Sequence, residues 1–455
     1  MGTGEGEVAP VRSTGRTAVA CGVDIGSTNI KIVAMDADGH VVARASRPTP
    51  RGARTPSIDA AALFRSIEQM IVALCAETLE VHAICAAGVG EDGVLVDSAL
   101  APLTEALAWF DPRRQSVFRS LRPRLHADDT FDAETDPVRT LVGWRWARAQ
   151  PSGGDAAHWI ALADYAGVVW SGRPYLSDTL ASRTAAWRSR DRTWASDRVD
   201  LTLGSADLLP VVVRTGDVVG DLRSPLLRDS GALARDAIVV AGGHDHPIGG
   251  WGVDQIAPGA VLDSMGTAEV VVIQSPRKGA KRHDYVDVAP GIRSTGTTLL
   301  RVEELARNVA WASQDPAVAA QIHAILTDEL RPLAVLDSGY FVPGRRGGGR
   351  PSYSLDAPRD PRARASAVLG ALALAGRDAV DAVRKDASEP TEVRLAGGWV
   401  HSPGWVRIKT DVNGYSTTPV YEPEVTAVAA ALLGAHARGW TPNPSIVFGG
   451  SAVRF

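Results

Sequence analysis

Two glycine-containing turns and one isolated carboxylate are the features of this sequence that could perform chemistry. The first turn lies in the run Asp24-Ile25-Gly26-Ser27-Thr28, and the second lies in Asp263-Ser264-Met265-Gly266-Thr267. Glycine lets the backbone approach an anion because no Cβ intervenes, and neighbouring hydroxyls and N–H groups can then cradle phosphate. Asp24 is suited to holding Mg²⁺ through water. One such turn alone is equally compatible with an ordinary Gly-Ser β-turn, but two copies favour a nucleotide held from both sides of a cleft.

The isolated carboxylate is Asp245, which follows Gly242-Gly243 and lies between His244 and His246. Beside a phosphate-binding cleft it can serve as the general base that takes the proton of an acceptor hydroxyl, a contribution of roughly 10²–10⁴-fold to a rate. Two other interpretations remain open. Asp245 can cap a helix that begins near Pro247, or the two histidines can bind zinc, for which no third ligand of suitable type is evident. We favour the base, and with it the transfer of a phosphoryl group from ATP to a hydroxyl.

The surrounding chain has the pattern of two similar α/β halves. Apolar residues at helical spacing (Leu63, Ile67, Met70, Ile71 and Leu74) predict an amphipathic helix that opens at Ser57 or Asp59. The predicted strands are 19–25, 30–35, 41–45, 81–89, 237–240, 261–263, 270–273 and 393–395, and further helices are predicted at about 365–385 and 424–437. Repeated halves of this kind imply a cleft between them.

Three further segments bear on ligand binding. Gly397-Gly398 ends a predicted strand, and paired glycines supply the surface without side chains that a flat adenine ring needs. The loop Gly90-Glu91-Asp92-Gly93 follows another strand, where ligand sites lie in open α/β sheets. Tryptophans are frequent between residues 108 and 207, and for most of them we predict a structural role in a helical cap.

Length and composition bound the class of protein. A chain of 455 residues predicts two or three domains, and 45% hydrophobic with 22% charged residues is typical of a soluble globular protein. A net charge of −4 argues against a nucleic-acid partner, and we interpret the basic run Arg188-Ser189-Arg190-Asp191-Arg192 as a solvated face.

No apolar run reaches the roughly 18 residues of a membrane span. Three cysteines make no closed disulfide framework, which predicts a reducing compartment. Residues 1–17 lack the apolar segment of a secretory signal and read as a disordered tail, so we expect a cytoplasmic protein.

Taken together, the motifs resemble those of a known family. The stretches CGVDIGSTNIK, AWFDPRR, GGHDHPIGGWG, GAVLDSMGTAEVV and LAGGWVHSPGWVRIKTDVNG, followed by EPEVTAVAAALLGA, occur in order from about residue 18 to 437. In this order they are similar to the FGGY family of carbohydrate kinases, within the superfamily of actin-like, hexokinase-like and chaperone-like ATPases. The resemblance implies an α/β fold of two actin-like ATPase (ribonuclease H-like) domains around a central cleft, at 18–248 and 249–455, with ATP and Mg²⁺ as cofactors.

The resemblance also implies a role for individual residues. Asp245 corresponds to the catalytic base and Asp24 to the Mg²⁺-associated aspartate. Nucleotide-binding residues are Asp24, Gly26, Ser27, Thr28, Gly266, Thr267, Gly397 and Gly398, and the sugar side has Trp109, Asp111 and His244. A helix cap before Pro112 is the alternative role for Asp111.

One loop departs from the family pattern. Xylulose-kinase-like members carry Gln-Met-His after the strand at 84–89, where this chain has Gly90-Glu91-Asp92-Gly93. We therefore expect Glu91 or Asp92 to hydrogen-bond a polyol or a ketose other than xylulose. The region Ser294-Thr295-Gly296 is also less like the family.

The leading hypothesis is an ATP-dependent sugar or polyol kinase, a monomer or homodimer whose partner is its small-molecule substrate. An actin-like or chaperone-like ATPase shares the turns but has no need for a sugar platform. A catalytically weak sugar sensor would bind sugar without turnover.

Overall fold

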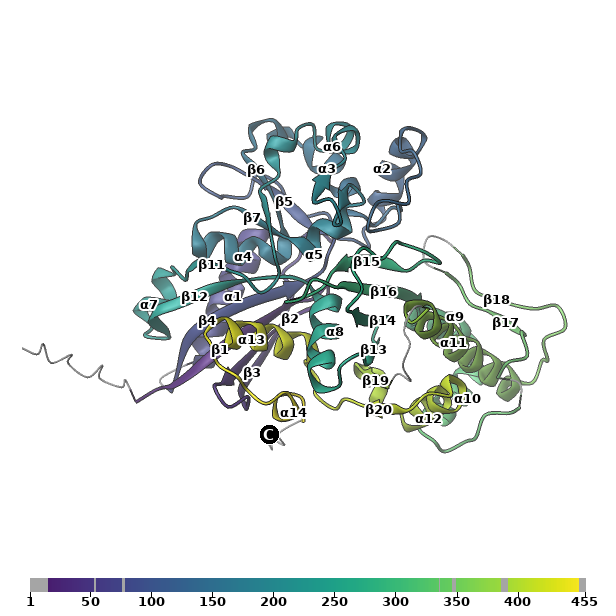
Figure 1. Ribbon diagram of the computed structural model, residues 1–455. Coiled ribbons are helices and arrows are strands. Elements are labelled where there is room, and N and C mark those ends of the chain that lie inside the picture. The colour runs from purple at the N-terminus through teal and green to yellow at the C-terminus, as the bar shows by residue number, and fades with distance from the viewer. Residues whose placement is uncertain are drawn as a thin grey trace, which may run out of the picture.

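The computed structural model of this protein describes residues 15–52, 55–75, 78–334, 336–345, 349–385 and 392–449. It has a mixed α/β fold built on two six-stranded sheets (Figure 1), which confirms the predicted fold class. Most of the predicted tail, residues 1–14, lies outside the described residues, and the first strand begins at Thr17.

The first sheet has the strand order β11-β12-β4-β1-β2-β3. β1 pairs antiparallel with β2 and parallel with β4, and β12 pairs parallel with β4. All five predicted strands of this half are present, most of them longer by a few residues than the apolar runs. Its strands are β1 (Thr17–Ile25), β2 (Asn29–Asp36), β3 (Val41–Pro48), β4 (Leu79–Gly88), β11 (Val218–Asp221) and β12 (Leu233–His244).

The second sheet repeats this plan with the order β15-β16-β14-β13-β19-β20. β13 pairs antiparallel with β14 and parallel with β19, as β1 does with β2 and β4. Its strands are β13 (Val261–Met265), β14 (Ala268–Ser275), β15 (Asp287–Pro290), β16 (Thr297–Glu304), β19 (Val393–Ala396) and β20 (Thr417–Pro419). The repeat therefore puts the two glycine turns at equivalent places, β1–β2 and β13–β14. The division of the chain after residue 248 stays a prediction.

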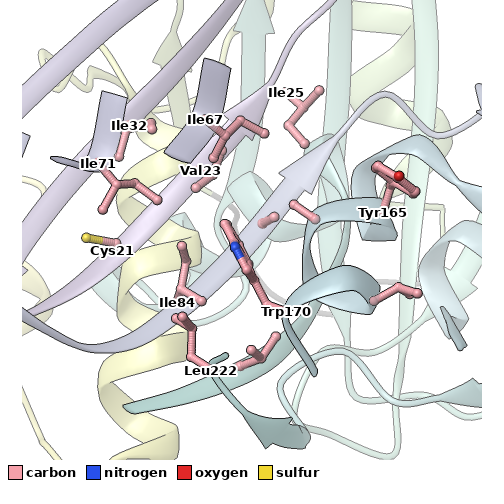
Figure 2. Close-up of a cluster of buried hydrophobic side chains, with 14 of the residues drawn as sticks. Cys21, Val23, Ile25, Ile32, Ile67, Ile71, Ile84, Tyr165, Trp170 and Leu222 are labelled. Atoms are coloured by element: carbon pink, nitrogen blue, oxygen red, sulfur yellow. The ribbon is translucent and has the colours of Figure 1, made fainter. Parts of the chain in front are cut away.

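Helices α1 (Ala60–Cys75) and α4 (Leu162–Ser171) cover one face of the first sheet. Asp59 opens α1, because its Oδ1 accepts a hydrogen bond from Ala62 N at 2.9 Å. Figure 2 shows the core beneath these helices, where Trp170 lies among aliphatic side chains. Its indole N–H donates to Glu68 Oε1 at 3.2 Å, which satisfies the polar atom that this tryptophan buries.

The tryptophan-rich region adds a smaller unit above the first sheet (Figure 1). Trp144, Trp159 and Trp187 are buried there in an apolar cluster of their own, as the structural interpretation predicts. The elements of this unit and its surroundings are β5 (Gly93–Val96), α2 (Arg113–Leu121), η1 (Arg122–Arg124), α3 (Thr140–Arg148), η2 (Pro151–Asp155), β6 (His158–Ala161), β7 (Tyr175–Ser177), α5 (Asp178–Ala181), η3 (Ser182–Thr184), β8 (Trp187–Arg188), β9 (Thr193–Trp194), α6 (Ser196–Thr202), η4 (Ala206–Leu208), β10 (Val211–Val213) and α7 (Pro225–Asp229).

Two helices cross between the halves. α8 (Asp245–Ile256) follows the first sheet but packs on β13 and β14, whereas α13 (Val425–Ala437) follows the second sheet but packs on β1 and β4. In Figure 1 the yellow α13 lies against the purple strands of the first sheet. A Cβ on Gly22 of β1 would lie 1.8 Å from Ala427 O, so this glycine allows helix and strand to meet. α13 is apolar on all sides and is buried on all sides.

The remaining helices pack around the second sheet. α11 begins at Pro361 and ends at Val383, a shift toward the N-terminus from the predicted 365–385, because Asp360 Oδ1 caps it through Ala363 N at 2.8 Å. The remaining elements are α9 (Ala306–Ala312), α10 (Pro316–Leu326), β17 (Phe341–Val342), β18 (Ser352–Tyr353), α11 (Pro361–Val383), η5 (Gly398–His401), α12 (Pro403–Asn413) and α14 (Pro444–Val447). Among the residues that the structure describes, every helix is too short or too polar to cross a lipid bilayer.

Candidate active site

A cavity of about 470 Å³ lies between the two halves, where both glycine turns face the start of α8. Ten of the predicted site residues line it: Asp24, Gly26, Ser27, Thr28, Glu91, Trp109, His244, Asp245, Gly266 and Thr267. Four others do not line it: Asp92, Asp111, Gly397 and Gly398. The fold thus brings one turn from each half, the isolated carboxylate and one aromatic ring to a single space.

The β1–β2 turn is tight. Gly26 N donates to Asn29 O at 3.0 Å, and Thr49 Oγ1 donates to Gly26 O at 2.7 Å. A Cβ on Gly26 would lie 2.8 Å from Asn29 O, which is too close for any other residue without a backbone shift. On the strands below, Asp24 faces Lys31 in the antiparallel register. This turn therefore presents backbone, hydroxyls and one carboxylate to the cavity.

The β13–β14 turn is more open. Gly266 N donates to Ala268 O at 2.9 Å, and Trp399 Nε1 donates to Gly266 O at 3.1 Å. A Cβ on Gly266 would have no atom nearer than 4.0 Å, so its face toward the cavity is free of protein. A large anion can approach the backbone there.

Asp245 is placed by the junction of β12 and α8. The junction is close-packed: Gly243 has φ of +143°, and a Cβ on it would lie 2.1 Å from Thr179 Oγ1. That same hydroxyl oxygen accepts a hydrogen bond from His244 N at 3.1 Å. Helix α8 begins at Asp245 itself and not near Pro247, because the chain leaves the strand directly after His244. The helix cap is the residue before Asp245, so the capping interpretation was wrong in its detail.

The Asp245 carboxylate is held on one side. Its Oδ1 accepts a hydrogen bond from His246 N at 2.7 Å and lies 3.3 Å from His244 Nε2. His246 Nε2 lies 3.6 Å from the same oxygen. The ligating atoms of these three side chains lie within 4.8 Å of one another, so a third group suited to a metal is present after all, namely the aspartate itself.

Burial controls the charge of these groups. Burial, and then the charge of Glu91, raise the pKa of Asp245 to about 7, although the Arg183 guanidinium opposes the shift. Burial, and then the Asp245 carboxylate, raise the pKa of Asp24 to about 7 against the influence of Lys31. Burial and the Arg183 charge lower the pKa of His244 well below its usual range, so this ring is neutral. Two carboxylates at one cavity wall are a donor set suited to a hard divalent cation such as Mg²⁺.

A buried ion-pair network supports the wall and was missed by the sequence analysis. Glu91 Oε1 accepts hydrogen bonds from Arg183 Nε at 3.1 Å and from Arg183 Nη2 at 2.7 Å. Arg183 Nη1 and Arg139 Nη2 donate to Asp287 Oδ2 at 2.8 and 2.9 Å. Asp287 belongs to β15, so the network joins the second sheet to the cavity wall of the first half. No motif marks it, because 104 residues separate Arg183 from Asp287.

The two acidic residues that do not line the cavity have arginine partners. Asp92 is buried with Arg114, whose Nη2 lies 3.3 Å from Asp92 Oδ1. Asp111 Oδ1 accepts a hydrogen bond from Arg113 N at 2.9 Å, and its Oδ2 lies 2.7 Å from the Arg113 guanidinium. The N-cap of α2 is Pro112, and Asp111, one residue earlier, accepts the N–H of Arg113, the first residue of the helix.

The paired glycines lie behind the second turn. Gly397 has φ of +87°, and a Cβ on it would lie 2.3 Å from Met265 O, so it lets β19 and the β13–β14 turn meet closely. A Cβ on Gly398 would meet nothing within 4 Å. Gly398 therefore offers an open surface without a side chain, and its adenine-binding role stays a prediction.

Residues 19–252, just over half of the chain, match the model of the N-terminal domain of the FGGY family of carbohydrate kinases. A xylulose kinase from Staphylococcus epidermidis is 22% identical over 93% of this chain and 88% of its own length. A glycerol kinase from Gloeobacter violaceus is 26% identical, over 90% of this chain and 86% of its own. The crystal structure of gluconate kinase from Lactobacillus acidophilus superposes with a TM-score of 0.82 at 18% identity, and covers 95% of this chain and 91% of that one.

Proposed function

This chain belongs to the FGGY family of carbohydrate kinases, enzymes that phosphorylate sugars at the expense of ATP, and we propose that Asp245 is its catalytic base. In this proposal a sugar or polyol hydroxyl attacks the γ-phosphorus of ATP, and ADP leaves. The observation that carries the proposal is the single cavity that holds Asp245 together with Gly26 and Gly266, one turn from each half.

The proton of the attacking hydroxyl goes to Asp245. Because Oδ1 already accepts the His246 N–H, Oδ2 is the atom that receives this proton. His244, neutral and within 3.3 Å of Oδ1, keeps the carboxylate oriented. The start of α8 also places backbone N–H groups at this end of the helix, which favours negative charge nearby.

Asp24 would hold Mg²⁺, and the bound ion would neutralise charge on the phosphates of ATP. Ser27, Thr28 and Thr267 would donate their hydroxyl protons to phosphate oxygens from opposite sides of the cavity. Gly398 would face the adenine ring. The two turns then fix the γ-phosphorus between them, and positioning of this kind supplies much of the rate in phosphoryl transfer.

The sugar would lie against Trp109 and Glu91. An indole face gives the apolar side of a sugar a surface to stack on, and a carboxylate accepts hydrogen bonds from its hydroxyls. Arg183 also lines the cavity, but Glu91 and Asp287 already occupy its guanidinium. We therefore propose a neutral substrate, a polyol or a ketose other than xylulose, and not a sugar acid.

The test is ADP release, screened with ketoses, deoxy-ketoses, aldoses and polyols and then repeated with Asp245→Asn. We expect the variant to lose about 10³-fold in kcat and to keep its affinity for ATP, because only proton transfer is removed. Asp254→Asn is the matched control, since Asp254 is on the same helix and outside the cavity lining. Full activity in Asp245→Asn would disprove the role of this residue. ATP hydrolysis that no sugar stimulates would instead favour an actin-like or chaperone-like ATPase.

A further inference from the structure

A second cavity, of about 730 Å³, lies apart from the one that holds Asp245. Its walls come from both halves of the molecule: the β8–β9 turn and residue 214 on one side, and the loops around β15 on the other. Its volume is within the range of small-molecule sites. Nothing in the proposed kinase reaction uses this space.

The lining of this cavity is strongly basic. Seven arginine and lysine side chains line it, against four aspartates. The basic residues are Arg188, Arg190, Arg192, Arg214, Lys278, Lys281 and Arg282. Arg190, Asp191 and Arg192 of the run at residues 188–192 are exposed, as a solvated face predicts, and the run also lines this cavity.

Four of these seven cations, all four of them exposed, have no ion-pair partner among the described residues. Arg188 has a partner in Asp128 at 2.9 Å, and Arg282 donates to Asp128 O at 3.3 Å. Within the part of the chain that the structure describes, no carboxylate lies within ion-pair distance of Arg190, Arg214 or Lys278, nor of Lys281.

Like charges from the two halves meet here. A Cβ on Gly279 would lie 3.9 Å from Arg190 Cδ, so the stem of this arginine lies against the loop that carries Lys278 and Lys281. Cations that face one another across an interface repel unless an anion lies between them. The cavity also offers hydroxyls at Ser294 and Thr295, which are donors suited to phosphate oxygens.

We propose that this cavity is a second ligand site that binds a small molecule with two or more phosphate groups. Four unpaired cations on two facing walls call for a multiply charged anion, since a single charge would leave most of the repulsion in place. Guanidinium and ammonium groups are the usual partners of phosphate in proteins. The proposal does not depend on the kinase mechanism, because the site shares no lining residue with the cavity of Asp245.

An anion bound in this cavity would stabilise β15, the strand whose Asp287 holds Arg183 at the wall of the first cavity. Val288, Ala289 and Pro290 of β15 line the second cavity, and Asp287 of the same strand holds Arg183. β15 is also tied to the first half by Val288 N, which donates to Asp132 O at 2.8 Å. A bridging anion would therefore strengthen an existing contact between the halves, and the melting temperature should rise when it binds.

Calorimetric titration with sodium pyrophosphate tests the proposal. The protein is first saturated with the non-hydrolysable ATP analogue AMP-PNP and Mg²⁺, at matched free Mg²⁺, so that the glycine turns are filled. We expect one pyrophosphate to bind per chain. Its affinity should be at least about tenfold higher than that of inorganic phosphate, because its two phosphate groups can contact the cations of both walls at once.

The double variant Arg190→Gln/Lys278→Gln removes one cation from each wall. Its affinity for pyrophosphate should fall by at least about tenfold, and the ligand-induced rise in melting temperature should disappear. Arg119→Gln/Arg122→Gln, an exposed pair on α2 and η1, is the matched control and should bind like the wild type. If the first double variant fails to fold, Arg214→Gln/Lys281→Gln replaces it. Complete displacement of pyrophosphate by AMP-PNP, no binding at millimolar pyrophosphate, or equal affinity in all variants would overturn the proposal.

Discussion

In the first glycine hairpin, β1–β2, Asp24 and Lys31 face each other at the wall of the cavity, and Lys31 Nζ lies 2.6 Å from Glu424 with a third of its side chain exposed. In the second hairpin, β13–β14, Asp263 and Glu269 lie sealed inside the protein. Lys409 of α12 neutralises both, at 2.8 and 2.6 Å, and none of the three is exposed by more than 1%. The same supersecondary unit thus turns a carboxylate toward the cavity in one half and toward its own core in the other.

This difference shows that a motif does not fix the role of its charged residues. A carboxylate that faces a cavity with a raised pKa can change its protonation state or bind a cation, as the pKa of Asp24 near 7 illustrates. A carboxylate that is buried beside a lysine contacts neither solvent nor a ligand, so its role is structural. The difference follows from position in the strand: Asp24 lies two residues before Gly26, whereas Asp263 lies three residues before Gly266 and so on the opposite face, where Lys409 meets it. In the second hairpin Ser264 is the residue that lines the cavity.

The largest effect that the comparison predicts is on stability, at the second hairpin. Lys409→Met should lower the free energy of unfolding by about 3–5 kcal/mol, because two buried carboxylates lose their cation. Lys31→Met should change it by no more than about 1 kcal/mol, since that pair is partly exposed. Urea unfolding measures both. Equal losses in the two variants would contradict the contrast between the hairpins.

The next effect is on catalysis, at the first hairpin. Asp24→Asn should lower kcat/KM for Mg·ATP by about 10²-fold, because the proposed cation site loses its charge, while stability is maintained or rises as a buried charge is removed. Asp263→Asn should do the opposite and lower stability, since Lys409 loses one of its two partners. Steady-state kinetics at varied Mg²⁺, with melting curves of both variants, separate the two results. A drop in stability in Asp24→Asn with normal kinetics would reverse the assignment.

A smaller effect should appear in the pH dependence. Asp245 must be ionised to accept a proton, and its pKa is raised to about 7. At saturating Mg²⁺, where the bound cation would keep Asp24 ionised, kcat/KM should therefore rise with pH up to about 7 and level off above it, with about a tenfold loss for each pH unit below. Asp254→Asn should keep the wild-type profile, whereas the residual activity of Asp245→Asn should lose this ascending limb. A profile that stays flat from pH 5 to 8 would exclude Asp245 as the base.

The smallest predicted effect concerns the glycines themselves. Gly26→Ala should cost about 1 kcal/mol of stability, because its Cβ would lie 2.8 Å from Asn29 O. The Cβ of Gly266→Ala would have no atom nearer than 4.0 Å, so this variant should keep the wild-type stability. Its methyl group would enter the space proposed for the phosphates, and KM for ATP should rise several-fold, which corresponds to about 1 kcal/mol of binding free energy. Thermal melting and ATP titration of the two variants test this. A KM for ATP in Gly266→Ala equal to that of the wild type would place the phosphates elsewhere.

Much of the fold was predictable because its signals are local. The apolar runs located every strand around the two turns, and their ends differed from the structure by a few residues, since strands extend beyond their most apolar part. Asp360 and Pro361 marked the true start of α11 and were overlooked in favour of the apolar periodicity. The predicted site residues that lie in short motifs, such as Gly26, Asp245 and Gly266, do share one cavity.

What failed to be predicted depends on side-chain direction and on distant partners. Glu91 and Asp92 were treated alike, but in the bend between β4 and β5 Glu91 lines the cavity, whereas Asp92 is buried beside Arg114. Two sets of buried ion pairs join residues more than a hundred positions apart: that of Arg183 with Asp287, and that of Lys409 with Glu269. Ion pairs of that kind leave no periodicity or motif in a single sequence.

The crossing of α13 to the first sheet has a consequence for how the molecule is made. During synthesis, β1 and β4 leave the ribosome long before residues 425–437 exist, so one face of their sheet stays uncovered until α13 has been made. The first half cannot complete its core as an independent nascent unit. A premature stop before Val425, which removes α13 and everything after it, would leave the apolar surface around Ala20 and Ala83 bare, and such a product is a substrate for chaperones and proteases.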